Sequence, residues 1–140
     1  MIVVDTNVLS EFMRPIPDEH VLSWMDATRS SDLWTTSVVI AELASGVATL
    51  PRGRRRSLLG DALDVMLERF EGRVLPFGLK SAFEYGRIVA LRTQLGRPIA
   101  IADAQIAAVV ISAGATLATR NIADFHGLGM EIVNPWSADV

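Results

Sequence analysis

The sequence of 140 residues contains no cysteine. This absence excludes a disulfide framework and a zinc site built on thiolates, and it favours a reducing compartment only slightly. Histidine is scarce as well, because His20 and His126 are the only two and stand far apart in the sequence, which gives no basis for acid–base catalysis. Neither sign of charge dominates, since 16 acidic and 13 basic side chains give a net charge of −3. This balance argues against a protein that wraps duplex DNA, but it allows a local basic patch or an acidic pocket.

The sequence shows no segment typical of export or membrane insertion. Its first four residues form a short apolar run that Asp5 interrupts, whereas a secretory signal has a basic start and a longer apolar core. The most apolar stretch, residues 99–118, contains Asp103, and a charge inside a membrane span is costly. We therefore interpret this stretch as a buried helix followed by a buried strand, and we expect a cytoplasmic protein that does not associate with membranes.

Half of the residues are hydrophobic, which is typical of one folded domain over residues 1–140. Short apolar segments alternate along the chain with segments of helical periodicity. This alternation predicts an α/β fold with helices on both sides of a mostly parallel sheet. In such sheets, binding sites lie at the carboxyl ends of the strands, near the point where the strand order reverses. The expected strands cover residues 1–4, 33–36, 73–77, 116–119 and 130–133, and the expected helices run through 21–25, 37–50 (with Ser37 as its cap), 58–70, 80–95 and 102–113.

Three acidic residues stand close to strand ends or helix starts. Each has an ordinary explanation alone: Asp5 as a helix cap, Glu42 as a solvent-facing residue, and Asp103 as a complement to a helix dipole. In a parallel sheet, however, all three positions lie at one edge, where the carboxylates would repel one another. A divalent cation such as Mg²⁺ or Mn²⁺ relieves this repulsion, and it can activate water for phosphodiester cleavage.

A fourth group of polar residues follows the expected strand at 116–119. The amide oxygen of Asn121 can bind a metal or a water molecule, Thr119 offers a hydroxyl, and Arg120 can meet a phosphate. The alternative interpretation of this segment is an ordinary turn, in which asparagine and aspartate are common.

These residues fall into motifs that resemble a known family. The chain is similar to the PIN-domain ribonucleases, in particular to VapC-type toxins and their FitB-like branch. The resemblance extends over nearly the whole chain, with the motifs in order and at fitting spacing. The matching segments are 3–11 (VVDTNVLSE), 41–43 (AEL), 101–108 (IADAQIAA), 117–121 (LATRN), 124–125 (DF) and 134–136 (NPW).

The resemblance implies a PIN domain, a three-layer sandwich whose central, mostly parallel sheet has about five short strands flanked by helices. It also implies an endoribonuclease that depends on Mg²⁺ or Mn²⁺. Asp5 and Asp103 would contact the metal directly, and Glu42 would complete the acidic set as a ligand or a base that orients water. Asn121 stands where the family usually has aspartate, which leaves the number of metal ions open. Supporting roles would fall to Thr6, Asn7, Thr119 and Asp124.

The resemblance further implies three macromolecular partners. An antitoxin similar to VapB or FitA, encoded beside the toxin, would wrap around it and obstruct the site, and the toxin itself would form a homodimer. Operator DNA would be bound only through the antitoxin, and RNA would be the substrate. Candidate RNA contacts are Arg54, Arg55, Arg56, Arg97 and Arg120, although the first three could simply be a solvated helix start. The three tryptophans, Trp24, Trp34 and Trp136, could stack on bases, but packing in the core is the simpler interpretation.

Two other interpretations remain open from the sequence. A phosphatase similar to the haloacid dehalogenases also has an aspartate after its first strand, but it needs a second aspartate two residues on, where this chain has Asn7. The second is a PIN-like domain that binds RNA or a partner without cutting. Asn121 keeps that interpretation open, because fewer carboxylates bind a metal ion less tightly.

Overall fold

The computed structural model describes residues 1–137, and its centre is a sheet of five parallel strands in the order β3-β2-β1-β4-β5. All five strands lie within the segments expected from the sequence. They are short, as the brief apolar runs indicate, and the outer two are the shortest. Their bounds are β1 (Ile2–Val4), β2 (Leu33–Thr36), β3 (Val74–Leu75), β4 (Thr116–Ala118) and β5 (Ile132–Val133).

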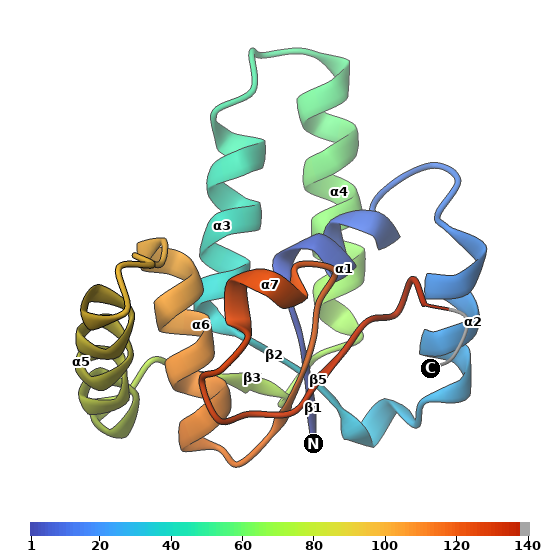
Figure 1. The fold of residues 1–140 in the computed structure, drawn as a ribbon. Helices are drawn as coiled ribbons and strands as arrows, with labels where there is room; N and C mark the ends of the chain where they lie inside the picture. Colours follow the sequence, from blue (N-terminus) through green and yellow to red (C-terminus); the bar gives the residue numbers. More distant parts are fainter. Residues whose placement is uncertain (138–140) are drawn as a thin grey trace.

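Seven α-helices flank this sheet in the part of the chain that the structure describes, and the expected three-layer α/β architecture is confirmed. Figure 1 shows α5 and α6 side by side at the left of the sheet, α2 at its right, and the hairpin of α3 and α4 standing above it. The helices are α1 (Thr6–Phe12), α2 (Glu19–Ala27), α3 (Ser37–Ala48), α4 (Arg54–Glu68), α5 (Leu79–Gln94), α6 (Ile101–Ser112) and α7 (Ile122–Phe125), with a short 3₁₀ turn at Ser30–Asp32.

The apolar stretch at residues 99–118 is a buried helix followed by a buried strand, as expected. Ala104, Ile106 and Val110 on α6 have no exposed surface, and neither does Leu117 on β4. A helix that is apolar on every side belongs in the interior of a protein, between other layers. Among residues 1–137, none of the helices combines the length and the apolar character that crossing a bilayer requires.

One local expectation from the sequence was wrong. Thr36, rather than Ser37, caps α3: its backbone is extended and its hydroxyl accepts a hydrogen bond from the Val39 amide at 3.1 Å, whereas Ser37 is already helical. The segment after β4, for which an ordinary turn was the alternative interpretation, forms the short helix α7. Phe125, fully buried at the end of α7, holds this turn of helix against the core.

The strand order reverses between β1 and β4. From β1 the chain builds β2 and β3 on one side, and it then crosses to build β4 and β5 on the other side. The Asp5 amide donates to the Ala118 carbonyl at 2.9 Å, so the ends of β1 and β4 leave the sheet together. The residues that follow β1 and β4 therefore face each other at the position where α/β sheets place their sites.

Candidate active site

Asp5 lies at the centre of the site, directly after β1. It is the N-cap of α1, and its Oδ1 accepts a hydrogen bond from the Thr6 amide at 2.7 Å. The residue is only 3 % exposed, which is rare for an aspartate. The capping role considered from the sequence is therefore real, but it uses one carboxylate oxygen only.

The other oxygen of Asp5 belongs to a network centred on Thr119, which is fully buried at the end of β4. The Thr119 hydroxyl donates to Asp5 Oδ2 at 2.7 Å. The same hydroxyl accepts from Asn7 Nδ2 at 3.2 Å and from the Asn121 amide at 3.1 Å. This single hydroxyl thus fixes the orientation of the carboxylate and ties the β1 and β4 ends to each other.

Glu42 reaches the site from α3, the helix after β2. Its Oε1 accepts a hydrogen bond of 2.6 Å from the hydroxyl of Thr6. Glu42 is half-buried, so the solvent-facing alternative does not describe it. Since Thr6 is the neighbour of Asp5, the bond holds the second carboxylate of the site next to the first.

Asp103 lies in the first turn of α6, whose N-cap residue, Ala100, offers no side-chain hydrogen bond. Burial, followed by the negative charges of Asp5, Asp124 and Glu42, raises the pKa of Asp103 from 3.8 to about 6, while Arg92 opposes the rise. Burial also raises the pKa of Asp5, even though the hydrogen bonds from Thr119 and Thr6 act against the rise. Burial is the largest cause for both residues, and the negative charges of neighbouring carboxylates add to the rise, as expected for acids at one sheet edge.

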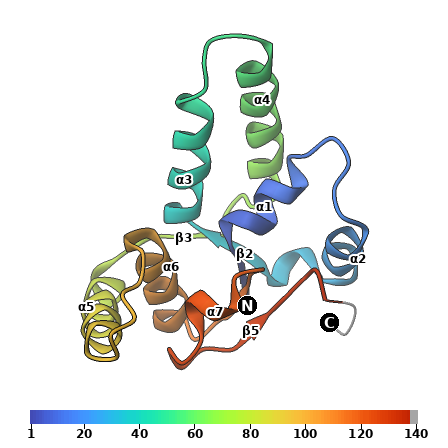
Figure 2. The same cartoon turned by 45° about the horizontal axis from the view of Figure 1, so that its top comes forward.

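These side chains line one pocket of about 480 Å³. The pocket brings together the three acids predicted from the sequence, Asp5, Glu42 and Asp103, and also Asn121 from the segment after β4. Figure 2 shows this region of the chain, with α1 at the base of the α3–α4 hairpin. The residues that line this pocket, called the acidic pocket below, are Asp5, Thr6, Asn7, Ser10, Glu11, Arg14, Glu42, Asp103, Arg120, Asn121 and Trp136.

The donor set of this pocket suits a hard divalent cation. It consists of carboxylate and amide oxygens, and a cation would favour the charged forms of Asp5 and Asp103, whose pKa values are raised by burial first and by neighbouring carboxylates second. Within residues 1–137, no three acidic or histidine side chains are gathered closely enough to enclose an ion by themselves. Magnesium does not need such a cage, because it typically takes one or two carboxylates and fills its other positions with water and substrate phosphate.

The two candidates for the fourth corner lie at different places. Asn121 lines the pocket, and although it occupies the N-cap position of α7, its side chain makes no capping hydrogen bond. Asp124 is exposed on α7 and does not line the pocket, but its charge raises the pKa of both Asp5 and Asp103. Asn121 is therefore the side chain at the pocket wall, and Asp124 adds only to its negative field.

The five arginines expected to contact RNA are spread over the surface. Arg120 lines the acidic pocket. Arg54 and Arg55, at the start of α4, line a neighbouring groove that also includes Glu42. Arg56 lies on the other side of the hairpin, and Arg97 is exposed in the loop before α6. Of these five arginines, only Arg120 lines the acidic pocket itself.

Two buried charged groups near the site were not identified from the sequence. Glu11 on α1 is 7 % exposed, and its Oε1 accepts from the Asp18 amide at 2.9 Å while its Oε2 pairs with Arg14 at 3.3 Å. Arg92 on α5 is 6 % exposed. It donates from Nε to the Arg97 carbonyl at 2.8 Å and from Nη1 to the Asp124 carbonyl at 2.9 Å. Arg92 therefore ties the loop before α6, which leads to Asp103, to α7.

Comparison with known proteins places this geometry in a family. The PIN domain model matches residues 2–126. The VapC ribonuclease Y4jK of Sinorhizobium fredii is 39 % identical over 97 % of this chain and 98 % of its own length. Toxin FitB of Neisseria gonorrhoeae is 38 % identical over 97 % of this chain and 99 % of its own length. A solved structure of FitAB bound to an IR36 DNA fragment superposes with a TM-score of 0.90 at 36 % identity, over 98 % of this chain and 96 % of that chain. The family model covers most of the chain, and the chain therefore belongs to the PIN domain family, among relatives that include VapC ribonucleases and toxin FitB.

Proposed function

We propose that this protein is the toxin of a toxin–antitoxin pair and that it cleaves RNA phosphodiester bonds with the help of Mg²⁺ or Mn²⁺. The observation that carries the proposal is the convergence of Asp5, Glu42 and Asp103, with Asn121, on one pocket at the switch point of the sheet. The relatives named as a ribonuclease and a toxin, each matched over nearly its full length, support the same assignment.

The side chains of the pocket divide the work among them. Asp5 and Asp103 would hold the metal ion, with Glu42 as a further ligand or as the base that orients water. A divalent cation bound there would offset the negative charge of a phosphate and make a water molecule a stronger nucleophile. Thr119 and Thr6 hold the carboxylates of Asp5 and Glu42 in fixed orientations through their hydrogen bonds.

The neutral amide of Asn121 provides one charge fewer than an aspartate would. One tightly held ion therefore fits the RNA-free protein, and any second ion would arrive with substrate phosphate.

RNA cleavage with a metal titration tests this proposal. Wild-type protein should cut a structured RNA in Mg²⁺ or Mn²⁺, EDTA should stop the cleavage, and Asp103→Asn should abolish it. Asp26→Asn, which changes an exposed carboxylate on α2, is the matched control and should cut like the wild type. Equal cleavage by wild type and Asp103→Asn would indicate a contaminating nuclease. If the wild type binds RNA but never cuts it, the protein is a binding module instead.

An apolar groove of about 790 Å³ beside the acidic pocket is the proposed antitoxin site. It runs between α1, α3 and α4, and it shares Thr6, Ser10, Arg14 and Glu42 with the acidic pocket. A partner segment seated there would reach the acids directly. The solved structure of FitAB on DNA supports such a partner, and we propose that operator DNA is likewise bound through the antitoxin.

Two exposed residues on α4 offer a matched test of this groove. Leu58 is 56 % exposed and lines the groove, whereas Val65 is 63 % exposed on the same helix and does not. Leu58→Glu should prevent co-purification with the protein encoded by the adjacent reading frame, while Val65→Glu should leave it intact. Both variants should still cleave RNA. Equal loss of the partner in both variants would contradict this assignment.

A homodimer and a cytoplasmic location complete the proposal. Leu79 and Phe83 lie one turn apart on α5, and they are 77 % and 76 % exposed. Exposed apolar pairs of this size favour contact with another protein surface. Phe83→Glu should therefore lower the mass measured by light scattering, and an unchanged dimer mass would exclude this face. Cellular RNA as the substrate would place the activity in the cytoplasm.

A further inference from the structure

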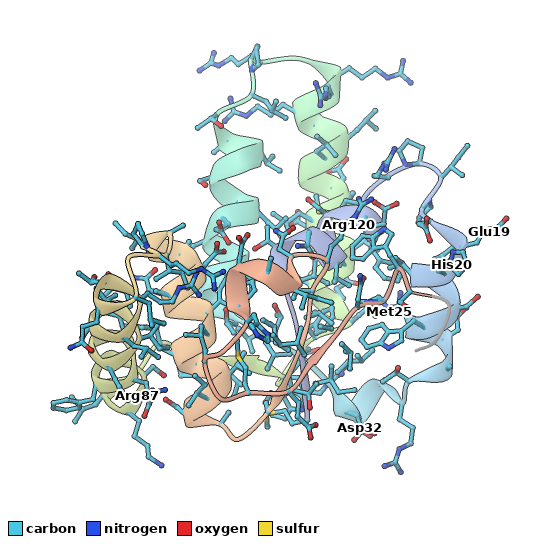
Figure 3. The ribbon with its side chains drawn as sticks, in the orientation of Figure 1. Glu19, His20, Met25, Asp32, Arg87 and Arg120 are labelled. Atoms are coloured by element: carbon cyan, nitrogen blue, oxygen red, sulfur yellow. The ribbon has the colours of Figure 1, made fainter. Side chains whose placement is uncertain are left out.

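An arginine and a tryptophan stack at the rim of the acidic pocket. The guanidinium carbon of Arg120 lies 5.2 Å from the centre of the Trp136 ring, within the range of a cation–π interaction. Both residues line the pocket that contains Asp5 and Asp103. Figure 3 shows Arg120 beside α1.

The sheet brings these two residues together from distant parts of the sequence. Ala118 on β4 pairs with Val133 on β5, and the Thr119 amide donates to the Val133 carbonyl at 2.9 Å, so the two chain segments leave the sheet side by side. Beyond them, backbone contacts fix both partners. The Arg120 amide donates to Asn7 Oδ1 at 3.3 Å, and the Trp136 amide donates to Asn134 Oδ1 at 3.0 Å.

The cation–π contact with Trp136 takes up no oxygen or nitrogen acceptor, so the N–H donors of the Arg120 guanidinium remain available to a ligand. Arg14, the other arginine of the pocket, forms an ion pair with Glu11. Within residues 1–137, Arg120 forms no ion pair, and its guanidinium contacts the ring of Trp136.

A phosphate is the ligand that suits this position. The neighbouring carboxylates repel a polyanion, and a cation at the rim offsets that repulsion. The planar fork of arginine matches phosphate oxygens in a two-pronged contact. Arg120 stands between Thr119, which orients Asp5, and Asn121, so a phosphate bound to it would lie beside the reacting position.

We propose that Trp136 is a positioning residue, which holds Arg120 so that its guanidinium binds a backbone phosphate of the RNA next to the acidic site. This inference rests on the proposed ribonuclease function. Trp136 is also partly buried against the core, and Arg120 covers its ring. We therefore assign its effect on RNA to its contact with Arg120 rather than to stacking with an RNA base.

Binding and kinetics on the full-length protein test the proposal. Binding of a short fluorescein-labelled single-stranded RNA is measured by anisotropy in the Asp103→Asn background, and KM and kcat are measured in the active protein. Trp136→Leu should weaken RNA binding and raise KM about two- to fivefold, the size of one exposed cation–π contact, with little change in kcat. Trp136→Phe should restore most of the binding, because phenylalanine offers a smaller ring for the same stack.

A double-mutant cycle separates an action through Arg120 from a direct contact with RNA. Arg120→Gln should reduce the dependence of binding on salt by about one phosphate contact, and adding Trp136→Leu to it should then change nothing further. Trp34→Leu, a partly buried tryptophan on β2, is the control and should lower stability without changing KM.

Two results would overturn the proposal while the ribonuclease function stands: unchanged binding and KM in Trp136→Leu, or an equal loss from Trp136→Leu with and without Arg120. Absence of RNA binding by the Asp103→Asn protein together with no cleavage by the active protein would overturn both.

Discussion

Replacing Asp103 by asparagine should stabilise the metal-free protein at neutral pH while it abolishes activity. Burial and the neighbouring carboxylates raise the pKa of Asp103 from 3.8 to about 6, so the folded protein binds this proton more tightly than the unfolded chain does. The resulting stabilisation is complete below pH 3.8 and is lost as the pH rises through about 6. At neutral pH, the wild type therefore carries a charge in a place that disfavours it, whereas the Asp103→Asn variant would carry none there.

The expected gain follows from the two pKa values. A difference of about 2 between them corresponds to about 3 kcal/mol at most. Because Asp103 is only half-buried, water screens part of this effect, and about 1–2 kcal/mol is the expected gain in the free energy of unfolding. Asparagine has nearly the same shape as aspartate, so the substitution introduces little change in packing.

Urea unfolding in EDTA at about pH 4.5 and about pH 7.5 measures this difference. The free energy of unfolding of the wild type should decrease from the lower pH to the higher. In Asp103→Asn this decrease should be smaller but still present, since the pKa of Asp5 is also raised. Asp26→Asn, at an exposed site on α2, should leave the pH dependence unchanged. Addition of Mg²⁺ should then stabilise the wild type more than Asp103→Asn. An Asp103→Asn protein no more stable than the wild type at neutral pH without metal would refute the reasoning.

Three further predictions concern the stability of the fold that holds the site. Thr119→Val should lower the free energy of unfolding by about 1–3 kcal/mol in urea, because it leaves buried polar partners unpaired; a loss within error would contradict the network. Arg92→Met should lower the free energy of unfolding by about 2–3 kcal/mol and speed amide exchange in α7, because two carbonyls lose their hydrogen-bond donor. Arg92→Lys should recover only part of this stability, since one ammonium does not reproduce the two-pronged donor geometry of the guanidinium. Gly114→Ala, at a φ of +61°, should lower the free energy of unfolding by about 1–2 kcal/mol and with it the melting temperature. Gly86→Ala, inside α5 with open space around it, should raise the free energy of unfolding by about 0.5–1 kcal/mol. Melting temperatures that shift in the same direction in both variants would refute this pair of predictions.

Most of the fold could be predicted from the sequence because the relevant signals are local. The short apolar run at residues 1–4 indicates a buried strand, and the periodicity of 58–70 indicates a helix, whatever lies elsewhere in the chain. The location of the site at one edge of the sheet could be predicted from the same signals. Asp5, Glu42 and Asp103 stand near strand ends or helix starts, and parallel strands gather such positions at one edge. Helix α7 was missed because four residues are too few to show a period.

What the sequence by itself determined is therefore the set of elements, the parallel sheet and the edge at which the acids meet. Only the tertiary structure decided which side chains are partners there. Thr6 and Glu42 are separated by 36 positions and Thr119 and Asp5 by 114, and the order of the strands brings each pair into contact. The burial of Arg92 and the stack of Arg120 on Trp136 were decided in the same way. The physical reason is that a local pattern specifies which face of an element is buried, whereas the partner on that face depends on the packing of the whole chain.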